Sequence, residues 1–457
     1  MADVLALDVG TSSVRARLYG LDGLHAEGIE AHETYAGDSG SIGELDPEAL
    51  VEAARTAIED VRVRASGEIA AVAASCFWHS LVAVDAAGIA LTPVLTWQDT
   101  RSVAEADELA EGLGAEALHE RTGCPPHPSF WPAKLLWLSR HEPELFRTAR
   151  RFISFSDYLY LRLAGSARTS LSMASATGLL DFARDSWDGA LLNALGLGAE
   201  RLPELSDDPV GDREPWFPAL GDGACSNVGT GCVTRERAAL MIGTSAAFRT
   251  VYPASSPRPR PGLFLYRLDE RRFVEGGSIS DGGNLRDWLE RTLAPHERID
   301  LAEVSPDEHG LTFLTLLGGE RSPGWNARAR GAVTGLTFAT EPRHIFQAAL
   351  EGLAHRLAEI AELMPEVEEI VGTGAALLKN QDWAQLIADV IGRPIVLSAV
   401  EEGSARGAAV VALERLGEQP ADAPLGRTLE PRPDRHERYR AARERQRELY
   451  REHSSFR

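Results

Sequence analysis

The first residues of the chain that suggest chemistry are an acid, a glycine and two hydroxyls in one short turn. Asp8 ends an apolar run, Gly10, Thr11 and Ser12 follow it, and residues 14–19 then alternate apolar and polar side chains. This pattern predicts a tight turn between two antiparallel strands. Gly10 lets the backbone approach a ligand, successive N–H groups can cradle a phosphate, and Asp8 can hold a hydrated Mg²⁺ nearby. An ordinary hairpin turn, which the same residue types favour, is the alternative.

The same arrangement returns near the middle of the chain. An apolar strand over residues 239–242 leads into Gly243, Thr244 and Ser245, and a second strand follows. Two such hairpins, one in each half, indicate a duplicated two-domain ATPase whose nucleotide lies in the cleft between the halves. The phosphates would then be held from both sides.

A third candidate for chemistry is Asp222, which follows a glycine and precedes a run of small residues, 223–231. The small side chains predict a closely packed helix with Asp222 at its N-terminus, where a nearby anion is favoured. A carboxylate that faces the centre of a cleft is well placed to take a proton from a substrate hydroxyl. An N-cap aspartate is the alternative, and the two roles are compatible.

Two further stretches combine aromatic and polar side chains at the ends of predicted strands. Trp78 and His79 follow a buried strand at 69–75, and Asp99 and Arg101 follow a shorter one. Open α/β sheets bind ligands at strand ends, and aromatic faces with polar tips suit a sugar. These four residues are therefore candidates for a sugar pocket. The alternatives are a packed, structural Trp-His pair, and an N-cap at Asp99 or Thr100 with a solvated Arg101.

The most irregular stretch, 123–132, contains four prolines and carries His127 and Trp131. Such a rigid loop is either a structural connection or a wall of a pocket. Another strand ends in the glycine turn 372–375, where the small residues leave room for a flat base or a ribose.

The elements that must position these residues follow the usual hydrophobic periodicities. A helix is predicted at 46–64, with Asp46 as its N-cap and Pro47 in its first turn. Further helices are predicted at 102–111, 133–140, 342–364, 380–391 and 401–414, and a charged one at 432–457 that docks through Tyr439 and Tyr450.

The composition excludes several functions. The chain has 457 residues, which suits two domains, and a net charge of −21, which argues against binding to nucleic acid or to an anionic membrane. Lys134 and Lys379 are its only lysines, and no P-loop motif is present. Without a Cys-x-x-Cys pair, a signal peptide or a long apolar run, we expect a cytoplasmic protein with reduced thiols and no zinc site.

Five of these stretches, in this order, resemble the FGGY carbohydrate kinase family over essentially the whole chain. They are the Asp8 hairpin, the Gly221-Asp222 segment, the Gly243 hairpin, the turn at 372–375 and the helix start at 403–409. The resemblance implies an α/β fold of duplicated, actin-like (ribonuclease-H-like) ATPase domains with a central cleft. It also implies a sugar-binding domain at 1–235, an ATP-binding domain at 236–430 and a charged helix at 431–457.

The resemblance further implies phosphorylation of a sugar hydroxyl with ATP and Mg²⁺. Asp222 would be the general base, Asp8 and Asp222 would lie at the metal, and substrate would contact Trp78, His79, Asp99 and Arg101 together with Asp222. ATP would be bound by Gly10, Thr11, Ser12, Gly243, Thr244, Ser245, Gly372, Thr373, Gly374 and Ala375.

Motif detail around Trp78, residues 95–101 and residues 276–284 is most similar to gluconokinase-type members, and Arg101 or another arginine would suit a gluconate carboxylate. The predicted substrate is thus a sugar or sugar acid, with gluconate favoured and xylulose, ribulose or glycerol as alternatives. An actin-like ATPase switch that is not a kinase is the alternative from another class. The oligomeric state stays open, and a homodimer is one option.

Overall fold

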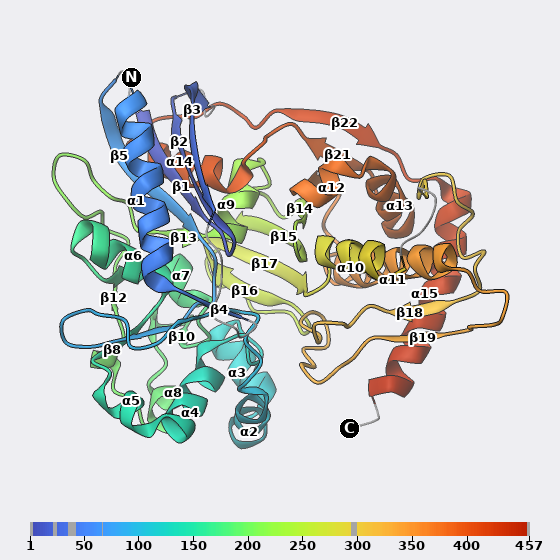
Figure 1. Cartoon of the computed structure of the whole chain (residues 1–457), viewed down its shortest axis with the longest axis horizontal. Coiled ribbons are helices and arrows are strands. Elements are labelled where there is room, and N and C mark those ends of the chain that lie inside the picture. Colours follow the sequence, from blue (N-terminus) through green and yellow to red (C-terminus); the bar gives the residue numbers. More distant parts are fainter. Residues whose placement is uncertain (1–2, 22–24, 35–42, 66, 294–298, 455–457) are drawn as a thin grey trace.

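Two β-sheets, one in each half of the chain, organise the fold (Figure 1). The structure is a computed structural model that describes residues 3–21, 25–34, 43–65, 67–293 and 299–454. The first sheet has the strand order β13-β5-β1-β2-β3, and the second has the order β16-β17-β15-β14-β20-β21-β22. The strands of the first sheet are β1 (Asp3–Val9), β2 (Ser13–Tyr19), β3 (His25–Thr34), β5 (Ile69–Cys76) and β13 (Leu220–Gly221). Those of the second are β14 (Arg237–Ile242), β15 (Ala246–Pro253), β16 (Phe264–Arg267), β17 (Arg272–Ile279), β20 (Glu369–Thr373), β21 (Ile395–Ser398) and β22 (Leu425–Leu429).

The two sheets repeat one pairing pattern. In the first sheet, β1 pairs with β2 antiparallel and with β5 parallel. On the outer sides, β13 pairs with β5 in parallel and β3 pairs with β2 antiparallel. In the second sheet, β14 pairs with β15 antiparallel and with β20 parallel. On the outer sides, β21 pairs with β20 in parallel and β17 pairs with β15 antiparallel. The chain therefore has the predicted duplicated, actin-like fold. Both predicted hairpins, β1–β2 and β14–β15, are confirmed.

Helices and short strands surround the sheets. The helices are α1 (Pro47–Arg64), α2 (Val103–Leu113), α3 (Ala115–Thr122), α4 (Trp131–His141), α5 (Pro143–Thr148), α6 (Phe155–Ala164), α7 (Leu171–Ser175), α8 (Gly189–Ala194), α9 (Asp222–Gly229), α10 (Gly283–Leu293), α11 (Pro342–Glu362), α12 (Ala375–Lys379), α13 (Gln381–Ile391), α14 (Gly403–Arg415), α15 (Pro433–Ser454) and the 3₁₀ turn η1 (Ala199–Arg201). The short strands are β4 (Glu44–Leu45), β6 (Val82–Val84), β7 (Val94–Leu95), β8 (Arg151–Ile153), β9 (Arg168–Thr169), β10 (Leu180–Asp181), β11 (Ser186–Trp187), β12 (Glu204–Leu205), β18 (Thr312–Leu314) and β19 (Ala332–Thr334).

Local capping explains where α1 begins. The Asp46 side chain accepts hydrogen bonds from the backbone N–H groups of Glu48 (2.9 Å) and Ala49 (3.2 Å), and Pro47 occupies the first turn, as predicted. Before α2, by contrast, the N-cap residue is Ser102. The interpretation of Asp99 as an N-cap is therefore wrong.

The first core is completed by a helix from the far end of the chain. It contains residues of β1, β5 and α1, and also Ala405, Ala408 and Val411 of α14. The second core surrounds β14, β20, α11 and α13, and a third lies among the helices that follow β7. α14 thus falls within the predicted 236–430 domain yet packs on the sheet of the first half. The domain boundaries stay a prediction.

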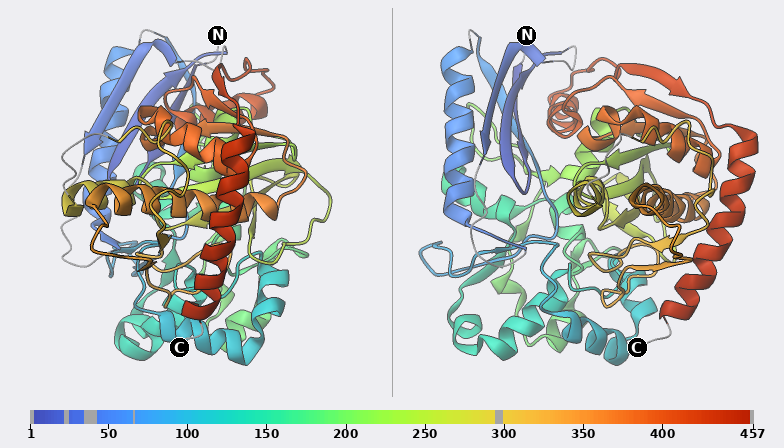
Figure 2. Two further views of the ribbon diagram at one scale, coloured as in Figure 1. Left: turned by 90° about the vertical axis from the view of Figure 1, so that its right-hand side faces the viewer. Right: turned by 45° about the vertical axis from the view of Figure 1, so that its right-hand side comes forward.

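The C-terminal helix α15 runs along the outer side of the second half (Figure 2). Tyr439 is fully buried in the second core, and the Tyr450 hydroxyl donates a 2.6 Å hydrogen bond to Glu320. Both tyrosines therefore dock the helix, as predicted. Residues 455–457 of the predicted helix lie outside the described residues.

The apolar character of the helices and the state of the cysteines complete the description of the fold. Among the described helices, none combines the length and apolar character needed to cross a membrane. All four cysteines are buried, and none forms a disulfide.

The two halves meet where α9 and α14 cross. A Cβ added at Gly407 would overlap the carbonyl oxygen of Cys225, and one added at Gly229 would overlap that of Gly403. Only glycine allows the two backbones to approach so closely. The small-residue pattern of both helices is the cause of this contact.

We expect Gly407→Ala to destabilise the protein by about 1–3 kcal/mol, because the added methyl group meets backbone that cannot move aside. Gly112→Ala in α2 is the control, since a Cβ there meets nothing within 4 Å. It should be neutral or stabilise by up to about 1 kcal/mol. Urea unfolding measures both. An unchanged midpoint for Gly407→Ala would contradict the tight crossing.

Candidate active site

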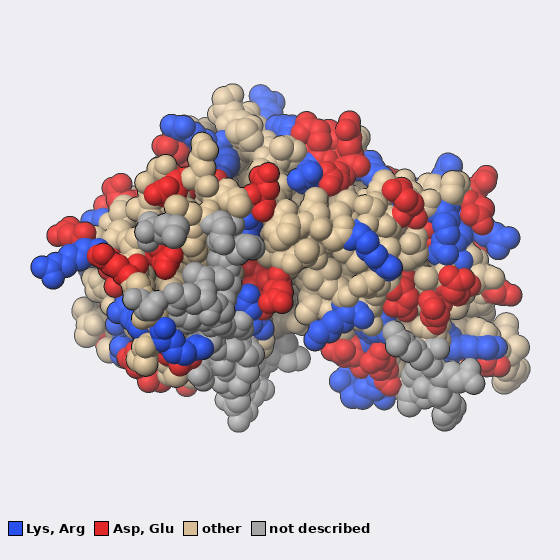
Figure 3. Space-filling model, turned by 90° about the horizontal axis from the view of Figure 1, so that it is seen from above, with Lys and Arg blue, Asp and Glu red and all other residues tan. Residues whose placement is uncertain are grey.

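A cavity between the two halves collects most of the residues that the sequence suggested for substrate and catalysis. The first half contributes Trp78, His79 and Asp222, and the second contributes Ser245. The remaining lining residues are Phe77, Trp97, Met241, Ala247, Arg249, Phe264, Tyr266, Ser278 and Arg321. Seen from above, the surface of the molecule is notched between the two lobes, and acidic and basic side chains are interspersed on this face (Figure 3).

Asp222 is held at the first position of α9, with Gly221 and not Asp222 as the N-cap residue. The Trp78 indole fills the space where a Cβ of Gly221 would lie and donates a hydrogen bond to the Ser172 carbonyl (3.1 Å). Trp78 therefore fixes the segment that carries the carboxylate. Burial raises the pKa of Asp222, while attraction from Arg249 and, more weakly, Arg321 acts in the opposite direction.

His79 lies in the turn after β5 in a left-handed conformation, with φ at 66°. Its Nδ1 lies 2.7 Å from the carbonyl oxygen of Ala176, so Nδ1 carries the proton. Burial lowers the pKa of His79 to about 3, and the ring is neutral at pH 7. Nε2 is then a hydrogen-bond acceptor suited to a substrate hydroxyl.

Asp8 lies near the end of β1, directly before the first turn, where Ser75 Oγ donates to its carboxylate (3.1 Å) and Arg15 lies 3.7 Å away. Burial raises the pKa of Asp8 to about 7, and repulsion from Glu402 and Asp222 adds to this effect. Glu402 and Asp222 thus lie close enough to repel the charge of Asp8, while Arg15 attracts Asp8 and Arg249 attracts Asp222. Carboxylate oxygens are the ligands that Mg²⁺ prefers. Among the described residues, however, the one group of three side chains whose ligand atoms lie within 4.8 Å of one another is Asp307, His309 and Glu351.

Each of the two phosphate-type turns is closed by a hydrogen bond from its glycine, but the first turn is one residue longer, because four residues separate the paired Val9 and Val14 and three separate Ile242 and Ala246. The Gly10 N–H donates to the Ser13 carbonyl, and the Gly243 N–H donates to the Ser245 carbonyl, both at 3.0 Å. The third glycine turn lies against the second hairpin, because a Cβ at Gly374 (φ 91°) would overlap the backbone of Ile242. The structure therefore brings the predicted adenosine turn to the second phosphate turn.

Two arginines of the cavity, Arg249 and Arg321, were missed by the sequence analysis. Arg249 is the one charged residue in the buried strand β15, a signal that could have identified it. Arg321 follows a Gly-Gly-Glu loop, and no local pattern distinguishes it from other loop arginines.

The structure does not bring Asp99 and Arg101 into the lining of this cavity. Arg101 pairs with Asp99 and Glu44 and stacks over the Trp137 ring, 5.1 Å from its centroid. A substrate role for Asp99 and Arg101 stays a prediction.

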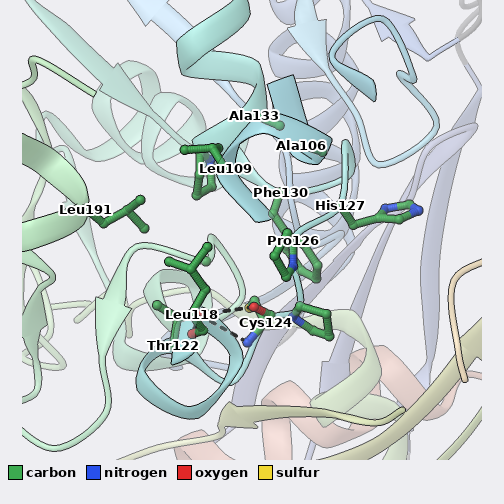
Figure 4. A pocket seen from close by; sticks show the side chains of 13 residues that line it. Ala106, Leu109, Leu118, Thr122, Cys124, Pro126, His127, Phe130, Ala133 and Leu191 are labelled. Atoms are coloured by element: carbon green, nitrogen blue, oxygen red, sulfur yellow. Dashed lines mark hydrogen bonds between the residues drawn. The ribbon is translucent and has the colours of Figure 1, made fainter. Parts of the chain in front are cut away.

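The Pro-rich loop 123–132 connects the halves. His127 Nε2 lies 3.2 Å from the carbonyl oxygen of Glu320 in the second half, and Ser129 Oγ donates to the Trp97 carbonyl. Trp131 is buried in the third core, away from the cavity. Beneath this loop lies a small pocket with apolar walls, including Leu109, Leu118 and Phe130 (Figure 4), which lacks the charged groups expected around a polyol.

Lys134 joins the loops that surround the cavity. Its Nζ is buried and donates hydrogen bonds to the carbonyls of Ser129 (2.6 Å) and His79 (3.3 Å). Burial lowers the pKa of Lys134 to about 7, although attraction from Asp99 acts against this. The ammonium group thereby positions the backbone of His79.

A duplicated actin-like fold with paired phosphate turns and a carboxylate in the cleft defines a class of phosphotransferases and ATPases. Two family models narrow this class, the N-terminal domain of the FGGY family of carbohydrate kinases over residues 4–208 and its C-terminal domain over residues 238–414. The chain belongs to the FGGY family of carbohydrate kinases.

Individual relatives carry different substrate names. The chain is 28% identical to a gluconokinase of Bacillus subtilis, covering 91% of this chain and 88% of the relative, and 28% identical to a xylulose kinase of the same species (90% and 88%). It is 31% identical to a glycerol kinase of Aromatoleum aromaticum, covering 90% of each. Among solved structures, a ligand-bound xylulose kinase and a gluconate kinase of Lactobacillus acidophilus match with TM-scores of 0.90 and 0.88, each at 27% identity over 100% of both chains.

We expect Lys134→Met to change how stability depends on pH. The unfolded lysine keeps its proton up to about pH 10.4, whereas the folded one releases it near pH 7, so the unfolded state binds more protons between these values. Wild-type stability should therefore rise relative to the variant as pH increases through this window. Urea unfolding at about pH 7 and about pH 9.5 measures the difference.

Lys379→Met, which removes the other lysine from an exposed site, controls for the loss of one charge. Parallel pH profiles for wild type and Lys134→Met would show that Lys134 has no lowered pKa.

Proposed function

We propose that this chain transfers a phosphoryl group from ATP to a hydroxyl of a sugar or sugar acid, with gluconate as the favoured substrate. One observation carries the proposal: the Asp222 carboxylate shares a cavity with Ser245 of the second hairpin and interacts electrostatically with Asp8 of the first. A proton acceptor thus lies among the groups expected to hold the phosphates. Membership of a carbohydrate kinase family supports this assignment.

ATP and Mg²⁺ fit the groups that the chain presents. The turns at Gly10–Ser12 and Gly243–Ser245 would bind the phosphates, Gly372–Ala375 would bind the adenosine, and Asp8 with Asp222 would hold the metal. When bound, Mg-ATP supplies the phosphoryl group and neutralises the charge that develops during transfer.

The residues of the chain then have distinct roles. His79 Nε2 accepts a hydrogen bond from a substrate hydroxyl and so orients the substrate, and Trp78 supports the Gly221-Asp222 segment. Asp222 accepts the proton of the hydroxyl that is phosphorylated. Closure of the two halves around the cavity excludes water and so limits hydrolysis of ATP.

The choice of gluconate as the substrate has less support than the assignment of the chain as a sugar kinase. A gluconokinase and a xylulose kinase are equally similar to this chain at 28% identity, so similarity alone does not separate them. Gluconate is favoured because the sequence motifs around Trp78, at 95–101 and at 276–284 are most similar to those of gluconokinase-type members of the family. Xylulose, ribulose and glycerol are the alternatives, and Asp99 and Arg101 stay candidates for substrate contact outside the cavity lining.

A substrate panel with coupled detection of ADP tests the proposal. Gluconate, xylulose, ribulose and glycerol are each supplied with Mg-ATP, and we expect ADP release to depend on the substrate and to be fastest with gluconate. ADP release that no polyol, ketose or aldonate increases would instead indicate an actin-like ATPase switch.

Asp222→Asn tests the general base. We expect the rate of phosphoryl transfer to fall about 10²–10⁴-fold, because the amide cannot accept the proton, while ATP affinity measured by calorimetry is retained. Asp188→Asn is the matched control, since Asp188 is equally an aspartate but caps α8 and pairs with Arg121. A purified Asp222→Asn variant with the parental rate would show that the base lies elsewhere.

A further inference from the structure

The cavity contains two buried guanidinium groups whose hydrogen bonds are incomplete. Arg249 and Arg321 have exposed fractions of only 5% and 8%. Nε and Nη2 of Arg249 and Nε of Arg321 have no hydrogen-bond partner, and neither residue forms an ion pair with any carboxylate of the described residues. Buried charges of this kind are costly unless a partner is present. A ligand that supplies negative charge is the natural partner.

The charges that line the cavity do not balance. Asp222 is its one carboxylate and His79 is neutral at pH 7, because burial lowers the pKa of His79 to about 3. Arg249 is the stronger of the two electrostatic partners of Asp222, and its Nη1 occupies the space that a Cβ of Gly223 would take. Asp222 therefore offsets Arg249. Arg321 is attracted by Asp281, a buried carboxyl outside the lining, but burial raises the pKa of Asp281 to about 7, so Asp281 offsets the charge of Arg321 only in part at neutral pH.

Arg321 is also held in a fixed orientation. Its guanidinium lies over the Trp97 ring, 4.3 Å from the centroid, and its Nη2 donates a 2.8 Å hydrogen bond to the Ile279 carbonyl. The contact with Trp97 joins this loop of the second half to the first half. An oriented, planar fork suits a carboxylate better than it suits a neutral hydroxyl.

Arg101, which the sequence suggested as the partner of a substrate carboxylate, differs from Arg321 because it is already paired with carboxylates of the protein. Asp99 and Glu44 already pair with it, so its charge is satisfied without a ligand. A substrate carboxylate would have to compete with both side chains.

We infer that Arg321 is the specificity residue of this kinase and binds the carboxylate of an aldonate substrate, which makes the cavity selective for sugar acids over neutral sugars. This inference rests on the proposed function, because it concerns the acceptor of the same reaction. A phosphoryl group of the nucleotide is the other source of an anion, and the experiment separates the two.

The test compares gluconate with gluconamide, which has the same hydroxyls and no charge. We expect wild type to prefer gluconate, and Arg321→Met to lower kcat/KM for gluconate by about 10²–10³-fold while kcat/KM for gluconamide changes less than about threefold. Arg321→Lys, which keeps the charge and loses the fork, should recover part of the loss. The KM for ATP should stay unchanged in both variants.

Arg201→Met is the matched control, because Arg201 also stacks on aromatic rings, Phe146 and Phe152, but lies outside the cavity. Thermal unfolding checks that each variant is folded. If Arg321→Met does not fold, the comparison of gluconate with gluconamide is made with Arg321→Lys alone.

Two results would overturn the inference. Equal losses on gluconate and gluconamide, or a raised KM for ATP, would assign Arg321 to the phosphoryl group. A wild-type enzyme that phosphorylates a neutral sugar and shows no preference for gluconate would leave the kinase function intact and remove the carboxylate site. Failure of the proposed function looks different, since wild type would then phosphorylate no substrate at all.

Discussion

The fold depends on the close crossing of two helices, one from each half of the chain. α9 and α14 approach so closely that Gly229 and Gly407 have no room for a side chain. This crossing positions α9, whose first residue is Asp222. The two sheets, each with its candidate phosphate turn, are attached to either side of it. The position of the candidate base relative to both turns therefore follows from a contact between backbones.

Charge in the centre of the molecule is the second constraint. On one side of Asp222, burial raises the pKa of Asp8, and repulsion from Glu402 and Asp222 raises it further. On the other side, Arg249 and Arg321 bring an excess of positive charge into a cavity with one carboxylate. A metal ion with nucleotide suits the first region and an anionic substrate suits the second. Under the proposed function, each of the two partners in the phosphoryl transfer would meet complementary charge.

Local patterns in the sequence predicted much of this structure, for identifiable reasons. The hairpins at Gly10 and Gly243 and the capped start of α1 depend on neighbouring residues alone, so periodicity and turn chemistry identify them. Arg321 could not be found in this way, because its surroundings come from distant parts of the chain, including the Trp97 ring on which its guanidinium stacks. Arg101 shows the converse, since it sits in a suggestive motif, yet Glu44 and Asp99 satisfy its charge. Whether a charge is already paired is a property of the tertiary structure.

The place of α14 has a consequence for synthesis of the protein. The first sheet is complete once residue 221 has been made, but Ala405, Ala408 and Val411 of its core are made much later. During translation the nascent first half must therefore expose apolar surface on β1 and β5 until nearly the whole chain has emerged. Such exposed surface invites aggregation, and contacts between distant segments form slowly. The ribosome-bound first half is accordingly a natural client for chaperones, although the finished protein hides the surface they would bind.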